Sequence, residues 1–374
     1  MHDLDIAIIG AGFAGLNLAH AVAGHGFRIA VVDKQTACPD IFRAEKIEAA
    51  QAELMREHGT LNMRSPRCKP VGKTLSFDGS RLVECDTVEQ YGISYADTVN
   101  SMRSKLPPDV PVIHAAASEV RPGGRSTILL DSGETIRAKL VVIATGDANQ
   151  LCKSLGMRRV SKSGLTSLSF GFYIARQDGS DFEFNGFNYF LADNPDKIHY
   201  LTIFPIGARM RVNLFTRLSP RSGIVPRLRT DTVETIGELF PNLLAYTGAI
   251  ELDSQVQVVS TAYYRLRNHH VPGVIVIGDA FQSVSPATGS GLSKVLTDVS
   301  VLSNLYRGKW KNMQAVGVEE VKAFYRHQTK AVCDRQSLKS WYYSDFGPNS
   351  TRSLLGRLQR RLDFSLQFPA STQT

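Results

Sequence analysis

The stretch DIAIIGAGFAGLNLAHAVAGHGFRIAVVDK, residues 5–34, decides the fold of this chain. An apolar run at residues 6–9 leads into the glycine-rich segment 10–15, and a helical apolar pattern follows over residues 16–23. A second apolar run, at residues 28–32, comes after the helix. This order predicts a strand, a tight turn, a helix and a second strand, which together form a βαβ unit.

The glycines of the turn each have a physical role in binding a dinucleotide. Gly10 permits the turn, Gly12 lets the backbone approach a pyrophosphate, and Gly15 allows the helix to pack on its strand. The N-terminus of the helix offers free N–H groups and a partial positive charge to the phosphates. Asp33 follows the second strand, where an acid accepts hydrogen bonds from ribose hydroxyls. A glycine-rich turn without a ligand is the alternative. The expected cofactor contacts also include Phe13, Ala14 and Lys34.

Composition restricts the class of protein. The chain has 374 residues, of which 43% are hydrophobic and 21% charged, as in ordinary globular enzymes. Its five cysteines are scattered without a CxxC pair, which favours a reducing compartment and argues against a structural zinc site. The net charge of +8 comes from dispersed basic residues, so we expect no nucleic-acid partner. The first strand is too short for a membrane span and no basic leader precedes it, which predicts a cytoplasmic protein.

The rest of the chain divides into three parts. Helical periodicity begins near residue 41 and runs to about residue 58, and a continuous apolar strand is expected at residues 140–146. Residues 167–217 alternate aromatic and β-branched residues between turn signals, which predicts an antiparallel sheet. A further buried strand at residues 273–281 contains Gly278 and Asp279 and leads to a long helix that Ser290 can cap.

We therefore predict an α/β fold: a Rossmann-like domain with an inserted antiparallel β-sheet domain and C-terminal helices. The expected boundaries are 1–166 with 251–310 for the discontinuous nucleotide domain, 167–250 for the sheet domain and 311–374 for the helical region.

Three separated motifs resemble those of the flavoprotein monooxygenases of the p-hydroxybenzoate hydroxylase type, over residues 5–336. Gly10, Gly12 and Gly15 match the family's FAD pyrophosphate turn, and Asp33 matches its ribose-binding acid. Arg43 resembles an arginine that the family places close to the flavin. The second FAD motif, with an aspartate for the ribityl chain and later residues near the flavin ring, is matched by Gly278, Asp279, Pro286, Gly289, Gly291 and Leu292.

The resemblance implies that the chain is an FAD-dependent monooxygenase, or hydroxylase. Such an enzyme inserts one oxygen atom of O2 into an aromatic or polyketide-like small molecule through a C4a-peroxide of the flavin, with NADPH or NADH as reductant. The N-terminus of the helix after Gly291 would face the edge of the ring that is negative in reduced flavin. The aromatic sheet would form the substrate wall, with candidate contacts Tyr189, Tyr200, Phe204, Arg211 and Asn213. No catalytic base is identified from the sequence, and for the polar candidates, including His269 and His270, a structural role is the alternative.

One departure from the family pattern leaves other functions open. The family carries an Ala-Asp-Gly strand end between the two FAD motifs, and here Thr145 replaces the acid. An oxygenase fed by a separate flavin reductase is therefore an alternative, as is a related FAD-dependent reductase or halogenase. The halogenase is disfavoured because its tryptophan-rich motif is missing, and the only tryptophans are Trp310 and Trp341. A non-enzymatic binding protein that has kept the fold is a further alternative.

The C-terminal tail suggests one further contact. Basic and apolar residues alternate over residues 351–368 with helical spacing, which predicts an amphipathic helix with arginines on one side. Such a helix packs on the body of the protein or lies on a membrane surface or a partner. A membrane contact would suit a lipophilic substrate.

Overall fold

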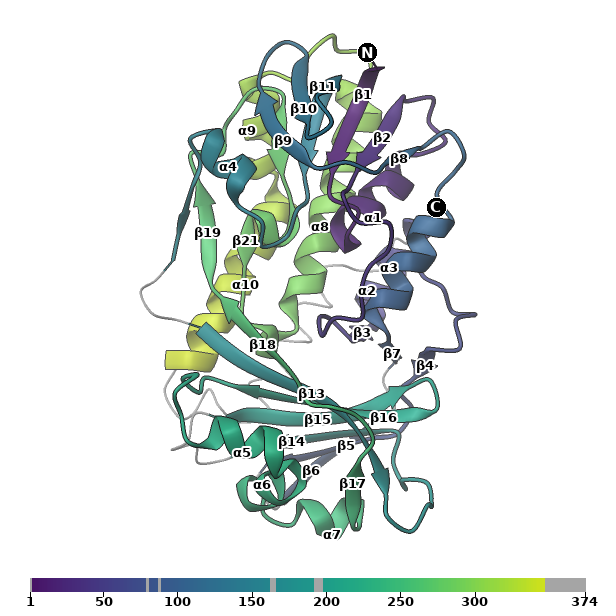
Figure 1. The fold of residues 1–374 in the computed structure, drawn as a ribbon, viewed down its shortest axis with the longest axis vertical. Coiled ribbons are helices and arrows are strands. Elements are labelled where there is room, and N and C mark those ends of the chain that lie inside the picture. Colours follow the sequence, from purple (N-terminus) through teal and green to yellow (C-terminus); the bar gives the residue numbers. More distant parts are fainter. Residues whose placement is uncertain (1, 79–80, 87–88, 162–165, 192–197, 347–374) are drawn as a thin grey trace.

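A computed structural model describes residues 2–78, 81–86, 89–161, 166–191 and 198–346 of the chain. Two layered halves face each other across its middle (Figure 1). The first 34 residues form the predicted βαβ unit at the top of this view, and the antiparallel sheet lies below it. The tail at residues 351–368 lies outside the described residues.

The upper half, which we call the Rossmann half, is built on a seven-stranded sheet with the order β8-β2-β1-β11-β10-β9 and β20 paired with β11. β1 lies between β2 and β11 and is parallel to both. The strands are β1 (His2–Ile9), β2 (Ile29–Val32), β8 (Val112–Ile113), β9 (Ala117–Arg121), β10 (Ser126–Leu130), β11 (Thr135–Ile143) and β20 (Val274–Val276).

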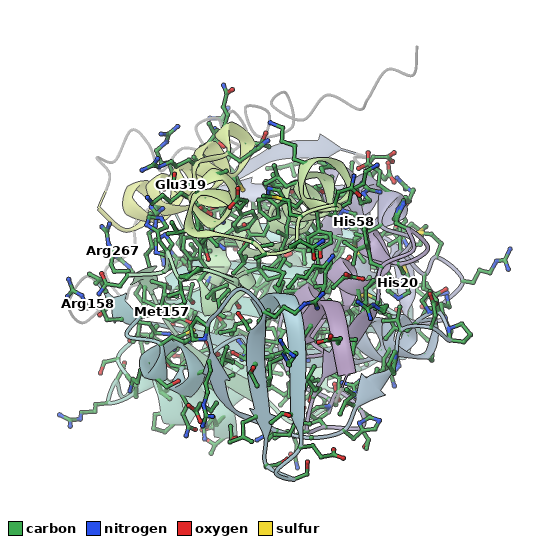
Figure 2. All side chains as sticks on the ribbon, turned by 90° about the horizontal axis from the view of Figure 1, so that it is seen from above. His20, His58, Met157, Arg158, Arg267 and Glu319 are labelled. Carbon is green, nitrogen blue, oxygen red and sulfur yellow. The ribbon has the colours of Figure 1, made fainter. Side chains whose placement is uncertain are left out.

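Helices surround this sheet, and α8 contacts α1, α2 and α10. Side chains of β2 and β20, of residues 6–9 in β1 and of residues 140–143 in β11 are all buried, as expected of parallel strands covered on both faces. The helices are α1 (Phe13–Val22), α2 (Ala49–Glu57), α3 (Tyr95–Ser104), α4 (Gln150–Ser154), α8 (Ser290–Leu305), α9 (Val318–Arg326) and α10 (Gln328–Phe346). Figure 2 shows this half from above, with His58 just beyond α2 and Glu319 in α9.

The lower half, the sheet half, contains an eight-stranded sheet with the order β17-β13-β16-β15-β14-β5-β6 and β18 paired with β13. All its pairs are antiparallel except β14 with β5. Its strands are β5 (Thr74–Asp78), β6 (Arg81–Asp86), β13 (Thr166–Arg176), β14 (Gly186–Phe190), β15 (Ile198–Ile206), β16 (Arg209–Thr216), β17 (Ile250–Leu252) and β18 (Gln257–Ala262). Three helices lie below the sheet in Figure 1: α5 (Ile224–Thr230), α6 (Thr232–Leu239) and α7 (Leu243–Thr247).

This sheet differs from the predicted domain at residues 167–250. It recruits β5 and β6 from the segment between α2 and α3, and β18 from beyond residue 250. The reason is long-range pairing: β14 pairs with β5, more than 100 residues earlier in the chain, and local periodicity carries no signal for such a partner. The predicted boundaries are therefore too narrow for the sheet.

Short strands connect the halves. One small sheet has the order β3-β7-β4 and another the order β12-β19-β21. The helix expected to begin near residue 41 begins at Ala49 instead, because residues 46–48 form a strand. The strands are β3 (Lys46–Glu48), β4 (Cys68–Pro70), β7 (Gln90–Ile93), β12 (Arg158–Val160), β19 (Tyr264–Arg267) and β21 (Gln282–Ser283).

Candidate cofactor and substrate site

A cavity of about 580 Å³ lies between the two halves. Its wall includes the glycine turn before α1, the segment after β2, the residues before α8 and one face of the lower sheet. The two FAD motifs, which are more than 200 residues apart in the chain, therefore meet in one site together with Arg43. A cavity at the carboxyl ends of parallel strands is where open α/β sheets bind their ligands.

The first glycine turn has the geometry that its sequence predicts. Gly10 has φ +110°, a conformation that favours glycine. A Cβ on Gly15 would lie 1.9 Å from the carbonyl oxygen of Gly10, so the close approach of α1 to β1 requires glycine there. A Cβ on Gly12 would meet only the Tyr95 hydroxyl, at 3.9 Å. Contacts with the described residues therefore do not require a glycine at position 12, and Gly12 lines the cavity.

The N-termini of two helices open on this cavity. α1 follows Gly12 and α8 follows Gly289, and neither N-cap glycine supplies a capping side chain. In α8 the Thr288 hydroxyl accepts the N–H of Ser290 at 3.4 Å. Phe13 and Ala14 of α1, and Gly291 and Leu292 of α8, line the cavity. The positive ends of these two helices form a site suited to negative charge on a ligand.

The expected cap of α8 takes a different form. Gly289, at φ +64°, occupies the N-cap position, and Ser290 is the first helical residue. The Ser290 hydroxyl lies 2.7 Å from that of Thr288 instead of capping the helix. Pro286 and Gly289 line the cavity as the motif predicts.

Asp33 is fixed at the end of β2 by backbone donors. Its carboxylate accepts hydrogen bonds from the N–H of Ala11 at 2.6 Å and of Gln35 at 2.8 Å. Arg103 of α3 lies 3.9 Å from the same carboxylate and donates to the Ala11 carbonyl. Asp33 lines the cavity, whereas its neighbour Lys34 is exposed and does not.

Arg43 lines the cavity and forms an ion pair of 2.9 Å with Asp147. Asp147 lies two residues after Thr145, the residue that stands where the family pattern has its acid. The Thr145 hydroxyl donates to the carbonyl of Ala148. Sequence analysis did not identify Asp147 or Arg103, because neither occupies a motif position and each is defined only by a partner distant in the chain.

Asp279 lines the cavity at the end of the second motif, and the Tyr264 hydroxyl donates to its backbone carbonyl at 2.7 Å. Burial raises the pKa of the Asp279 carboxyl, and the nearby Lys294 charge is the largest opposing influence. Lys294 of α8 also donates to the Gly278 carbonyl at 3.1 Å. Gly278 itself has φ +62° and donates its N–H to Asp298 at 2.9 Å.

The lower sheet presents its two faces differently. Tyr200, Phe204 and Asn213 line the cavity, as predicted. Tyr189 does not: it lies on the opposite face, in the core that packs on the helices α5–α7, and its hydroxyl donates to the Pro241 carbonyl at 2.5 Å. The expectation that Tyr189 contacts substrate is therefore corrected.

Arg211 also differs from its predicted role, because it is 1% exposed and does not line the cavity. Its Nε donates to the Glu45 carboxylate at 2.8 Å, and Glu45 does line the cavity. Burial raises the pKa of Glu45 to about 7, although the Arg211 charge lowers it. Sequence analysis missed Glu45, which precedes the unpredicted strand β3.

The residues present fit a flavin dinucleotide. The turn before α1 and its N-terminus could hold a pyrophosphate, and Asp33 could hold a ribose. Asp279 could accept hydrogen bonds from a ribityl chain, and the N-terminus of α8 could face the ring. His269 and His270 do not line the cavity: their rings pack together and on Tyr325. Among the described residues no group of His, Cys, Asp and Glu could hold a metal ion.

Comparisons with known proteins agree with this geometry. The family model described as squalene epoxidase matches residues 138–355, and the one described as pyridine nucleotide-disulphide oxidoreductase matches residues 4–168. The chain is 22% identical to the 3-demethoxyubiquinol 3-hydroxylase of Escherichia coli, covering 92% of this chain and 90% of that protein. It is 25% identical to the 3-amino-4-hydroxybenzoate 2-monooxygenase PtnB3 of Streptomyces platensis, covering 81% and 80%.

A solved structure shares the fold. The flavin-dependent brominase Bmp2 superimposes with a TM-score of 0.74 at 14% identity, over 98% of this chain and 90% of the brominase. None of the helices among the described residues has the length and apolar character of a membrane span.

Proposed function

The chain belongs to the squalene epoxidase family and is an FAD-dependent monooxygenase, and from this premise we propose that it hydroxylates an aromatic or polyketide-like small molecule. The observation that carries the proposal is that the two FAD motifs and one face of the lower sheet line the same cavity. Bound FAD, once reduced, supplies the activation of O2. The protein then has to place the substrate and exclude water.

The proposal gives each motif residue a position on the cofactor. Gly10, Gly12 and the N-terminus of α1 hold the pyrophosphate, Asp33 holds the ribose and Asp279 holds the ribityl chain. The residues around Gly289 and the N-terminus of α8 support the flavin ring. Arg43 lies beside them in its pair with Asp147.

The source of electrons is a second question within the proposal. NADPH or NADH reduces the flavin directly in a self-sufficient hydroxylase. Thr145 in place of the family's acid keeps the alternative open, in which a separate flavin reductase is a partner. The 14% identity to the brominase concerns the fold alone and does not favour a halogenase.

Location is part of the proposal as well. We place the enzyme in the cytoplasm because Cys38, Cys68, Cys152 and Cys333 are free thiols. A contact of the tail at residues 351–368 with a membrane surface stays a prediction from the sequence.

Anaerobic stopped-flow absorbance of the flavin band tests the proposal. The yellow protein is mixed with NADPH or NADH, with and without a panel of phenols and quinolones. Faster bleaching with one aromatic compound present supports a self-sufficient hydroxylase. Protein that dithionite bleaches but neither nucleotide does supports the reductase-fed form. Purified protein that binds no flavin contradicts both.

A further inference from the structure

Several polar side-chain atoms of the cavity wall have no hydrogen-bond partner among the residues that the structure describes. They are buried oxygens from three adjacent strands and from the loop before α8. Since buried polar groups in proteins are normally paired, these atoms indicate where a polar part of the substrate binds. The atoms are Ser169 Oγ on β13, Thr202 Oγ1 on β15, Asn213 Oδ1 on β16 and Ser285 Oγ.

The sheet register brings the strand residues together. Thr202 pairs with Asn213 across β15 and β16, and Asn213 pairs with Gly171 across β16 and β13. Ser169 is two residues before Gly171 on the same strand, so its side chain points to the same face. The polar atoms therefore belong to one patch of the sheet that faces the cavity.

Glu45 lies beside this patch and lines the cavity from the segment just before β3. Its side chain is 8% exposed and its Oε2 accepts the hydrogen bond from Arg211. A carboxylate has about four acceptor positions, so this bond leaves acceptor capacity toward the cavity. The Asn213 side chain also hydrogen-bonds to Glu45.

Arg211 is held away from any substrate. Its Nη2 donates to Gln257 at 2.7 Å, and its guanidinium lies 4.9 Å from the ring centres of both Phe42 and Tyr173. A Cβ on Gly171 would lie 2.3 Å from Nη2, so the glycine makes room for the guanidinium. The positive charge is thus paired and covered, and the cavity meets the carboxylate instead.

We propose that Glu45 binds the hydroxyl group of a neutral phenol or enol substrate and accepts its proton. The inference rests on the proposed function and specifies its substrate class and its base. A substrate with a carboxylate is disfavoured, because its negative charge would lie beside the Glu45 carboxylate, whereas Arg211 of the sheet is already paired with Glu45.

In the proton transfer, the O–H bond of the substrate breaks, an O–H bond forms on Glu45, and the electron pair stays on the substrate oxygen, from which it delocalises onto the ring. This makes the ring carbons richer in electrons and hence more reactive toward the electrophilic oxygen that bound FAD would supply. When the hydroxylated carbon loses its hydrogen as a proton, the ring becomes aromatic again and Glu45 returns its proton to the oxygen.

The electrostatic surroundings suit this role. Burial raises the pKa of Glu45 to about 7, Arg211 and Asn213 oppose the rise, and Asp40 adds to it. Tyr173 also interacts with Glu45, and burial raises the pKa of its hydroxyl, so it stays neutral. A base whose pKa lies near neutral pH can both accept and return a proton.

The test uses FAD-loaded protein and three probes: 2-naphthol, its methyl ether 2-methoxynaphthalene, and 2-naphthoate. Perturbation of the flavin absorption band reports the dissociation constant of each. We expect wild type to bind 2-naphthol about tenfold more tightly than the ether, the size of one hydrogen bond to a charged group. We also expect this preference to weaken as the pH falls below about 7, because Glu45 takes up a proton.

In Glu45→Gln, the preference for 2-naphthol over its methyl ether should no longer depend on pH, and most of the tenfold difference in affinity should be lost. Because this change leaves Arg211 without its charge partner, the double variant Glu45→Gln with Arg211→Met is measured too. Flavin content and melting temperature show whether the double variant is folded. Glu89→Gln is the matched control, since it makes the same change in an exposed ion pair with Arg56. It should bind all three probes as wild type does.

Three results would overturn the inference in protein that is yellow and folded. They are tighter binding of 2-naphthoate than of 2-naphthol, no binding of 2-naphthol, and an unchanged preference in both Glu45 variants. Failure of the proposed function gives a different result, because the purified protein would then contain no flavin.

Discussion

Lys330 of α10 and Asp298 of α8 form an ion pair of 2.5 Å in which the side chains are 0% and 1% exposed. Asp298 also pairs with Lys294 at 3.2 Å and accepts the N–H of Gly278 at 2.9 Å. Asp334 pairs with Lys330 at 3.2 Å, so two lysines and two aspartates balance each other. This buried network connects α10 directly to the second FAD motif.

Asp298→Asn should therefore destabilise the protein strongly. The change removes the carboxylate with which Lys294 pairs, and loss of one partner of a buried pair costs about 3–5 kcal/mol. Urea unfolding of wild type and variant measures the loss of free energy. Glu238→Gln, in the exposed pair with Arg227, is the control and should cost less than about 1 kcal/mol. Similar losses in the two variants would contradict the structural role of the network.

Gly12 and Gly15 of the first motif should respond differently to substitution. Gly15→Ala places a Cβ 1.9 Å from the Gly10 carbonyl, so we expect it to lower the free energy of unfolding by about 2 kcal/mol or more. Gly12→Asp has open space in the protein, so the apoprotein should fold as wild type does but purify with little flavin. Circular dichroism melting and the flavin released on denaturation measure the two effects. Wild-type flavin content in Gly12→Asp would refute the assignment of the turn.

Asp279→Asn should separate cofactor binding from stability. Because the pKa of the Asp279 carboxyl is raised in the folded protein, the fold favours the protonated carboxyl. The stability that this carboxyl contributes is therefore fully present below its pKa in the unfolded chain and is lost as the pH rises through its pKa in the folded protein. At neutral pH the charged carboxylate therefore disfavours the empty fold, and the amide should raise the melting temperature of the apoprotein. Flavin affinity should fall about tenfold, because a charged acceptor is lost. A variant that is less stable without flavin, or that binds flavin as well as wild type, would count against this assignment.

His58 predicts a loss of stability in acid. Burial lowers the pKa of its ring to about 4, and its Nε2 lies 3.0 Å from the Ser300 hydroxyl. A depressed histidine pKa gives stability that is full above the unfolded value of 6.5 and is lost as the pH falls toward 4, by up to about 3 kcal/mol. His58→Gln should flatten this part of the stability profile measured by urea unfolding. Because burial also lowers the pKa of His269 to about 4, some slope should persist in the variant.

The local sequence was sufficient to predict the glycine turn and the buried strands, because both depend on residues close together in the chain. Gly10 and Gly15 are defined by a turn and by a contact five residues apart, and Asp33 is bonded to that turn at the end of the next strand. The apolar runs at residues 6–9 and 140–146 need burial on both faces, which their composition alone reveals. The FAD-dependent monooxygenase class followed from these motifs.

Only the tertiary structure decided which residues face the substrate. Alternation along a strand separates two faces but does not say which of them is covered by helices, so Tyr189 and Tyr200 looked equivalent although one packs on α5–α7 and the other lines the cavity. Arg211 was expected to reach a ligand, but it pairs with Glu45, which lies 166 positions away. A contact of that range leaves no trace in local periodicity, because burial and charge neutralisation arise only when the two halves pack together.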